Sequence, residues 1–310
     1  MKYTVTHCRM LSASIKEVTV SGPASVSDMT HAGAHFKWLI PGLDDCRHYS
    51  TVHVNEVADG QFTFAIRLSP DSASSQYIRT LAVNDSVELE GPLNTFNYPL
   101  DADSGRDIAI AGGIGITPLT GILRHLDALN RPAHLHYFAK SADDAVYARH
   151  LQEQLQERLQ LHFSGSRPAI SEVLADLRAD DRLYVCGPAA MLSAVLSHAE
   201  SVGLAREQIH LEVFNVARDD AAQGFVIEAA DSGVSVNVGP QQSLLEALEA
   251  AGLDPLYDCR RGECGVCALD VLEGDVDHRD FIMSEQEAAC SARIYPCVSR
   301  AKSPRLKLAI

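Results

Sequence analysis

The feature that most constrains this chain is a group of four cysteines close to the end of the sequence. Three fall in one short stretch and the fourth follows later: Cys259, Cys264, Cys267 and Cys297. A C-x4-C-x2-C run followed by a distant cysteine is the ligand spacing of plant-type [2Fe–2S] clusters. Gly262 and Gly265 allow the loop to curl so that backbone N–H groups point at the sulfur atoms. The spacing therefore predicts a [2Fe–2S] cluster held by these four thiolates.

A tetrahedral zinc site is the alternative for the same cysteines. Zinc sites favour two closely spaced cysteine pairs, and only Cys264 and Cys267 form such a pair. Cys290 lies outside the spacing, and we expect it to be a buried structural thiol. Cys46 and His48 imitate half of a Rieske pattern, but no Cys-x-x-His follows them, so we expect no Rieske centre in this chain.

The cysteine content also bears on the cellular compartment. Eight cysteines would suit a disulfide scaffold in a short secreted protein, but this chain has 310 residues, and in long chains without a signal peptide they are more often ligands or free thiols. The first residues lack the charged-then-apolar plan of a signal peptide. No run approaches the about 18 apolar residues of a membrane span. We expect a cytoplasmic protein without membrane association.

The formal net charge of the chain is −15. Phosphate binding needs a concentration of Lys and Arg, so this charge argues against a nucleic-acid partner. Two interpretations stay open: the charge serves solubility alone, or it steers the protein towards a partner with a basic docking face. We expect the protein itself to be a monomer.

Residues 1–102 have the pattern of an all-β domain. Short runs rich in β-forming residues, separated by turn residues, predict strands at 51–57, 62–68 and 86–90. Their spacing favours a small antiparallel β-barrel.

Residues 103–222 alternate between predicted strands and helices. Apolar runs predict strands at 107–111, 133–138, 182–186 and 209–214, with a helix from Thr117 after the first. Such alternation implies a mostly parallel, doubly wound α/β sheet. A stripe of residues four apart predicts a further helix whose apolar face packs in the core: Tyr147, Leu151, Leu155 and Leu159.

Residues 223–310 follow a polar segment, 217–224, that we interpret as a linker. Strands at 225–229 and 234–238, a helix at 243–251 and the cysteine loop predict an α+β, β-grasp-like ferredoxin domain. The expected fold is therefore multidomain, with an antiparallel β-barrel, a doubly wound α/β domain and a ferredoxin domain.

Two turns in the α/β domain predict a dinucleotide site. The first turn contains Gly112, Gly113, Gly115, Thr117 and Pro118, and the second contains Cys186, Gly187 and Pro188. Backbone amides and the positive end of the following helix favour a pyrophosphate at such a turn. Pro118 stands where the third glycine of G-x-G-x-x-G would be, so the first turn alone is also compatible with a simple strand-to-helix connection.

The predicted barrel carries a second candidate site. Arg47, Tyr49 and Ser50 offer a guanidinium, an aromatic ring and a hydroxyl on one strand. On an extended strand, Arg47 and Tyr49 share one face, whereas His48 and Ser50 share the other. Taken alone these residues need no functional explanation.

These three motifs, in this order, resemble those of the phthalate dioxygenase reductase family, a branch of the ferredoxin–NADP⁺ reductase superfamily, over nearly the whole chain. The family's R-x-Y-S flavin motif is similar to Arg47, Tyr49 and Ser50. Its G-G-I-G-I-T-P and Y-x-C-G-P motifs match residues 112–118 and 184–188, and residues 91–96 are similar to the segment that closes the flavin barrel. The resemblance implies a flavin-binding barrel at 1–102, an NADH-binding domain at 103–222 and a [2Fe–2S] domain at 223–310.

The resemblance also implies roles for individual residues. Ser50 would lie near flavin N5, while Arg47 would face the flavin phosphate. Thr117 and Cys186 would approach the nicotinamide, which makes them catalytic candidates together with Ser50. Phe214 is similar in position to an aromatic residue that packs on the flavin.

The phosphate site departs from the family pattern. Relatives usually carry Gly-Gly-Ser where this chain has Ser72-Ala73-Ser74-Ser75. The hydroxyls of Ser74 and Ser75 can still bind a phosphate, so we expect FMN, with FAD as the alternative.

The choice of nucleotide depends on the residues after the second strand of the α/β domain. Asp143 would accept hydrogen bonds from a ribose 2′-OH and repel a 2′-phosphate. Lys140 favours a phosphate instead, but members of the family often carry Arg here without preferring NADPH. We therefore expect NADH.

Together these features predict an NADH-dependent flavin iron–sulfur oxidoreductase that supplies single electrons to a separate oxygenase. We expect a Rieske non-haem iron enzyme that acts on an aromatic acid or a quaternary amine, either an aromatic-ring dioxygenase or an O-/N-demethylase. The flavin is needed because a nicotinamide gives two electrons together and the cluster accepts one. The alternatives are a cytochrome P450 as acceptor, or a ferredoxin-type carrier with an inactive flavin domain. The intact flavin and glycine motifs argue against the carrier.

Overall fold

The computed structural model describes residues 1–23, 32–43, 46–54, 58–94, 96, 105–214, 222–290 and 292–310. Residue contacts divide the chain into two compact units, and each is described by itself. The first comprises Met1–Gly187 and Ser201–Glu212, and the second comprises Pro188–Glu200 and Val213–Ile310. No helix in the described part of the chain is long and apolar enough to cross a membrane.

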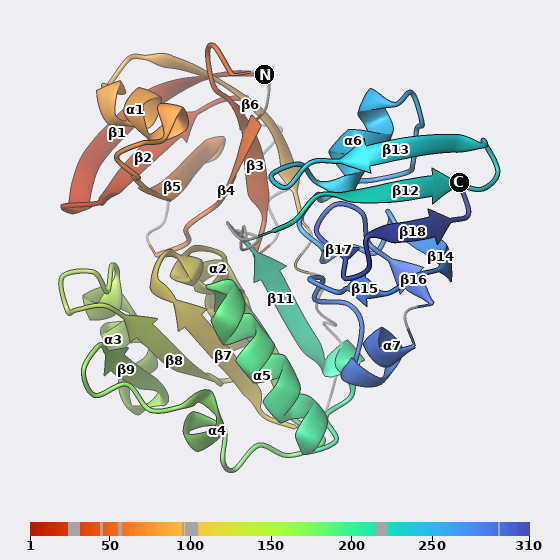
Figure 1. The fold of residues 1–310 in the computed structure, drawn as a ribbon. Coiled ribbons are helices and arrows are strands. Elements are labelled where there is room, and N and C mark those ends of the chain that lie inside the picture. The colour runs from red at the N-terminus through yellow and green to blue at the C-terminus, as the bar shows by residue number, and fades with distance from the viewer. Residues whose placement is uncertain are drawn as a thin grey trace. The chain divides into compact units, whose positions relative to one another are not determined.

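Six strands of the first unit form an antiparallel barrel (Figure 1). They are β1 (Lys2–Ser12), β2 (Ile15–Ser21), β3 (His35–Leu39), β4 (Cys46–Ser50), β5 (Gln61–Arg67) and β6 (Ser86–Leu93). Their order is β4-β3-β6-β1-β2-β5, and a bridge between Thr51 and Phe64 joins the two outer strands. Alternate side chains point inwards, and the ring of Trp38 lies edge-on 5.1 Å from that of Phe64 in the core.

The barrel departs from the prediction at two places. The strand expected at 51–57 is wrong over residues 51–54, which follow β4 and contribute only the bridge at Thr51. Residues 55–57 lie outside the described residues. Helix α1 (Ala73–Thr80) was not predicted, and Ser72 caps its first turn by accepting a hydrogen bond from the backbone N–H of Ser75.

The second sheet has five strands in the order β11-β10-β7-β8-β9. In chain order, its strands and the helices between them are β7 (Asp107–Gly112), α2 (Ile116–Ala128), β8 (Ala133–Ala139), α3 (Ala148–Leu155), β9 (Leu159–Phe163), α4 (Ile170–Val173), β10 (Arg182–Gly187), α5 (Ala189–Ser201) and β11 (Ile209–Val213). Strand β7 pairs in parallel with β8 on one side and with β10 on the other. The doubly wound sheet is therefore confirmed, and its strand order reverses between β7 and β10.

The predicted helix through Tyr147, Leu151, Leu155 and Leu159 is wrong at both ends. Leu151 and Leu155 are buried in α3 as expected. Gln156 takes a left-handed φ of 53°, which ends the helix and turns the chain so that Leu159 begins strand β9. Tyr147 precedes α3 with a φ of 64°, and its hydroxyl donates to Glu17 at 2.7 Å.

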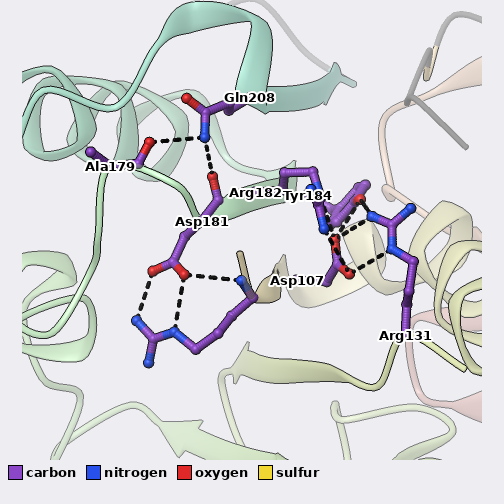
Figure 2. A network of polar contacts seen from close by, with 8 residues as sticks. Asp107, Arg131, Ala179, Asp181, Arg182, Tyr184 and Gln208 are labelled. Atoms are coloured by element: carbon purple, nitrogen blue, oxygen red, sulfur yellow. Dashed lines mark hydrogen bonds and ion pairs between the residues drawn. The ribbon is translucent and has the colours of Figure 1, made fainter. Parts of the chain in front are cut away.

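Asp107 ties the amino ends of β7 and β10 together (Figure 2). Its carboxylate accepts hydrogen bonds from Arg131 at 2.8 Å, from Arg182 at 2.9 Å and from the Tyr184 hydroxyl at 2.9 Å. Burial raises the pKa of Asp107, but these donors outweigh it and leave the pKa below its usual value. A second carboxylate, that of Asp181, is drawn in the same view. It accepts a hydrogen bond from Arg106 at 2.7 Å.

Replacing Asp107 by Asn is expected to lower the free energy of unfolding by about 3–5 kcal/mol, because the buried Arg182 and the partly buried Arg131 lose their counter-charge. Asp176→Asn is the matched control: Asp176 also pairs with an arginine but is 74% exposed, so its loss should cost less than about 1 kcal/mol. Urea denaturation followed by circular dichroism measures both. Because the pKa of Asp107 is depressed in the fold, its contribution is lost as the pH falls through the acid range. An equal cost for the two variants would contradict this account.

The second unit contains a mixed sheet in the order β13-β12-β18-β14-β16 and a short pair, β15-β17. Its elements are β12 (Phe225–Ala229), β13 (Val234–Val238), α6 (Leu244–Ala250), β14 (Leu269–Glu273), β15 (Val276–Asp277), α7 (Glu285–Ala289), β16 (Arg293–Ile294), β17 (Arg300–Ala301) and β18 (Arg305–Leu308). Leu244 and Leu248 of α6 pack with Ile227 and Leu306 of the sheet in one core. The predicted α+β ferredoxin fold is confirmed.

The predicted domain boundaries stay predictions. Residues 102 and 103 lie outside the described residues, as do residues 217–221 of the linker.

Candidate functional site

The cysteine loop brings its four thiols together in the second unit. The sulfur atoms of Cys267 and Cys297 lie 3.4 Å apart. Burial raises the pKa of the Cys259 thiol, which receives a backbone N–H from Arg261 at 3.3 Å and also contacts the Cys264 thiol. The chain thus presents two pairs of thiols, with backbone N–H groups aimed at sulfur.

Two glycines give the loop its shape. Gly262 and Gly265 have φ angles of 73° and 78°, which side-chain-bearing residues rarely adopt. A Cβ on Gly262 would lie 2.7 Å from Cγ2 of Val298, so the loop also needs glycine for space.

The two pairs fit a two-iron cluster better than a single ion. A structural zinc ion needs four ligands around one point. A [2Fe–2S] cluster instead takes two protein thiolates on each iron. Cys290 is exposed at the end of α7 rather than buried, so the prediction of a buried thiol is wrong. It ends a short surface helix and has no core to enter.

The glycine turn meets the end of β10 at the point where the strand order reverses. A Cβ on Gly115 would lie 2.2 Å from the carbonyl oxygen of Cys186, so the two turns are in direct contact. Gly112 ends β7, and Thr117 and Pro118 lie buried in the first turn of α2. The carboxyl ends of strands at such a point form the usual crevice for a dinucleotide.

Arg67 adds a positive charge to the same turn. Gly113 has a φ of 57°, and its missing Cβ would lie 3.3 Å from a guanidinium nitrogen of Arg67 at the end of β5. A guanidinium beside the backbone amides at the start of a helix is suited to bind a phosphate. The sequence analysis missed Arg67, because no local pattern distinguishes it from other strand arginines.

The remaining candidates of the nucleotide site lie at the ends of their strands. Cys186 and Gly187 end β10. Pro188 is the first residue of the second unit, and its carbonyl oxygen accepts hydrogen bonds from backbone N–H groups in the first turn of α5. Asp143 is exposed in the turn after β8, whereas the neighbouring Asp144 is held by the Ser141 hydroxyl at 2.9 Å. Asp143 therefore has a carboxylate available to a ligand at this edge.

In the barrel, Tyr49 lies close to Arg47 and Ser74. Burial raises the pKa of Tyr49, while a hydrogen bond with Ser74 and the charge of Arg47 lower it. The rings of Tyr49 and Trp38 lie edge to face, with their centroids 5.7 Å apart. The structure therefore brings together three of the predicted flavin-binding residues.

Ser74 and Ser75 occupy the first turn of α1, where both are buried. The Ser74 hydroxyl contacts that of Ser72 at 2.8 Å, and the Ser75 hydroxyl accepts the backbone N–H of Ser69 at 2.9 Å. Hydroxyls at the positive end of a helix favour an anion such as a phosphate.

Ser50 leads to a buried acidic group that the sequence analysis missed. Its hydroxyl donates to Glu212 at 3.3 Å, and Nδ1 of His35 lies 3.8 Å from the other carboxylate oxygen. All three side chains are almost fully buried. A charged residue in a predicted buried strand, two positions before Phe214, was the signal that could have revealed Glu212. Phe214 is part of the second unit and half buried.

Comparison with known proteins decides the family. Residues 3–98 match the model of the oxidoreductase FAD-binding domain, and residues 227–302 match that of the 2Fe-2S iron-sulfur cluster binding domain. The chain is 33% identical over 296 residues to the heme-dependent oxidative N-demethylase beta subunit of Ectopseudomonas mendocina, covering 94% of this chain and 93% of the relative. It is 34% identical to the vanillate O-demethylase oxidoreductase of Acinetobacter baylyi, covering 71% and 70%. The chain belongs to the phthalate dioxygenase reductase family.

The solved structures agree with this membership. Phthalate dioxygenase reductase itself superposes with a TM-score of 0.68 over 100% of this chain and 98% of that one, at 24% identity, which shows the shared fold. An intact type IV self-sufficient cytochrome P450 monooxygenase matches with a TM-score of 0.69 at 28% identity, over 100% of this chain and 41% of that one. As a member of the family, the chain is an oxidoreductase with flavin-binding and [2Fe–2S] domains.

Proposed function

We propose that this protein is the NADH-dependent reductase component of an oxygenase system, which passes electrons from NADH through FMN and a [2Fe–2S] cluster. The observation that carries the proposal is the arrangement of four cysteine thiols in two pairs, with Cys267 and Cys297 at 3.4 Å. This arrangement of thiols occurs in the same chain as the candidate dinucleotide site at the end of β7 and the flavin motif of β4. A two-electron donor and a one-electron outlet in one chain require a flavin between them.

Binding of the nucleotide is supported by the contact between the glycine turn and the end of β10, where the strand order reverses. The amides of the glycine turn and the guanidinium of Arg67 would hold the pyrophosphate, and Asp143 would accept hydrogen bonds from the ribose 2′-OH. A 2′-phosphate would meet the Asp143 carboxylate, which supports NADH over NADPH. Thr117 and Cys186 would border the nicotinamide.

Binding of the flavin is supported by the cluster of Tyr49, Arg47 and Ser74. The Tyr49 ring would pack along the isoalloxazine, while Arg47, Ser74 and Ser75 would neutralise and bind a phosphate at the start of α1. This anion site would take the single phosphate of FMN. Bound there, the flavin accepts a hydride and releases electrons one at a time.

The buried group of Ser50, Glu212 and His35 is suited to hold a proton. Oxidation of NADH to NAD⁺ releases two electrons and one proton, and the cluster carries electrons only. Glu212 can accept that proton through the Ser50 hydroxyl, and His35 can share it from the other side. This group would therefore take up the proton that the cluster cannot carry.

The acceptor we propose is the oxygenase component of the same system, a Rieske non-haem iron oxygenase or demethylase. The support is that relatives covering most of this chain are named as partners of oxygenases, among them the vanillate O-demethylase oxidoreductase and a carnitine monooxygenase reductase subunit of Escherichia coli. A haem-containing acceptor is the second candidate, because the relative that matches 94% of this chain is named for a heme-dependent demethylase.

The purified protein is expected to contain one FMN and two iron atoms per chain, and to oxidise NADH with a higher kcat/KM than NADPH. Acid extraction and chromatography identify the flavin, and ferricyanide reduction with each nucleotide measures the preference. A purified protein that contains iron but no flavin would instead favour the alternative of a ferredoxin-type carrier with an inactive flavin domain.

Asp143→Asn should lower the ratio of kcat/KM for NADH to kcat/KM for NADPH, because it weakens the contact with the ribose. Asp144→Asn should leave this ratio unchanged, because the Asp144 carboxylate is already held by Ser141.

A further inference from the structure

Three exposed apolar side chains flank the cluster ligands. Leu256 and Tyr257, just before Cys259, are 78% and 40% exposed, and Val266, between the second and third cysteines of the loop, is 47% exposed. Leu256 is the most exposed large apolar residue in the described part of the chain. Apolar groups gathered around a functional centre mark an interaction surface more often than chance exposure does.

The chain is anchored on both sides of Leu256, so its exposure is built into the fold. Leu253 packs against the core of the second unit, and Pro255 is buried. Cys259 is buried again in the cluster loop. Residues 256–258 therefore form an outward bulge between fixed points and have no route into the core.

Tyr257 is held in place by its neighbours. The guanidinium of Arg260 lies 4.1 Å from the centre of the Tyr257 ring and forms an ion pair with Glu249 at 2.7 Å. Arg260 has a φ of 54°, a left-handed conformation that side-chain-bearing residues rarely adopt. An aromatic side chain fixed in advance loses little conformational freedom on binding, which favours it as an interface anchor.

The charges around this surface are acidic. Arg260 and Arg261 are each paired with a carboxylate of the second unit. Asp254 and Asp258 are exposed, and within the described residues neither takes part in an ion pair. Residues 223–310 carry 14 Asp and Glu against eight Lys and Arg. A complementary partner would present an apolar depression with Lys or Arg at its border.

We infer that Leu256, Tyr257 and Val266, bordered by Asp254 and Asp258, form the docking surface for the protein that takes electrons from the cluster. This inference rests on the proposed function, since it describes the acceptor of the proposed electron path. Two of these apolar residues precede Cys259 and the third lies between Cys264 and Cys267, so an acceptor docked there would place its own redox centre next to the electron outlet. Val266 and Leu256 would enter its apolar depression.

The test uses the complete holoprotein and cytochrome c, a basic protein acceptor, as the probe. The variants are Leu256→Ser and the double variant Asp254→Asn/Asp258→Asn. Leu272→Ser is the matched control, because Leu272 is a 50% exposed leucine on β14 of the same unit. The KM for cytochrome c should rise roughly fivefold or more in Leu256→Ser and stay unchanged in Leu272→Ser. The double variant should weaken the dependence of kcat/KM on salt relative to the unaltered protein.

Stopped-flow absorbance of the flavin and the cluster separates the possible outcomes. Reduction of both by NADH should be the same in all variants. If Leu256→Ser matches Leu272→Ser with cytochrome c, the docking surface is wrong. If Leu256→Ser instead slows electron transfer from flavin to cluster, the surface faces this chain's own flavin domain and the inference is overturned. If NADH fails to reduce the cluster in the unaltered protein, it is the proposed function that fails.

Discussion

Replacing Cys297 by serine is expected to remove the [2Fe–2S] cluster while NADH oxidation at the flavin continues. A hard hydroxyl is a poor replacement for a soft thiolate on iron, and Cys267 loses the sulfur that lies 3.4 Å from its own. Loss of a group that merely contacts a metal ligand costs roughly 10–100-fold. Because Cys297 would itself be a ligand, the rate of electron transfer through the cluster should fall by more than that. The glycine turn, the end of β10 and the flavin motif lie in the first unit, so ferricyanide, which takes electrons directly from flavin, should still be reduced.

Cys290→Ser is the control for this experiment. Cys290 is exposed, and its thiol contacts the carbonyl oxygen of Gln286 at 3.6 Å. This variant should keep its iron, its visible spectrum and its transfer to a protein acceptor. Iron analysis and stopped-flow reduction by NADH measure both variants. Loss of the cluster from Cys290→Ser, with its retention in Cys297→Ser, would reverse the assignment of the fourth ligand.

The cluster loop was predictable because its information is local. Three of the four proposed ligands lie in nine residues, and the two glycines between them take a left-handed backbone that glycine adopts readily. The same holds for the glycine turn after β7, where a short apolar strand, three glycines and a helix follow one another directly. Patterns of this kind do not depend on the rest of the chain.

The groups that surround the predicted sites were not predictable in the same way. Glu212 reaches Ser50 across 162 residues of sequence, and Arg67 reaches the glycine turn from a strand of the barrel. Such contacts exist only after two elements have been placed side by side. Sequence patterns report the period and composition of single elements, and tertiary contacts of this length leave no local trace.

The helix with the wrong boundary has a different cause. Leu151, Leu155 and Leu159 are all buried, so their apolar character was interpreted correctly. The chain reverses at Gln156, whose left-handed φ carries no sequence signature because it is neither glycine nor asparagine. A residue four positions further along a helix and the first residue of a strand can satisfy the same apolar pattern.

Gly115 is expected to tolerate no side chain, for reasons of space alone. Its backbone lies in the ordinary helical region, with a φ of −62° and a ψ of −4°, so alanine is compatible with the conformation. The added Cβ would lie 2.2 Å from the carbonyl oxygen of Cys186 and 2.5 Å from its carbon, and both are backbone atoms that cannot rotate away. The turn after β7 and the end of β10 would have to separate. Overpacking of this kind costs about 1–3 kcal/mol or more.

Gly115→Ala should therefore raise the KM for NADH and slow flavin reduction by tenfold or more. A loss of roughly 1.4 kcal/mol in the binding or positioning of NADH already corresponds to a factor of ten. Gly239→Ala is the matched control, because a Cβ there would meet only side-chain atoms of Gln242 at 3.7 Å. Stopped-flow reduction of the flavin at several NADH concentrations measures the effect, and dithionite should reduce the cluster equally in both variants because it needs no nucleotide site. Thermal unfolding shows whether Gly115→Ala remains folded at the assay temperature. A folded Gly115→Ala protein with unaltered kinetics for NADH would mean that the nucleotide does not bind where β7 and β10 meet.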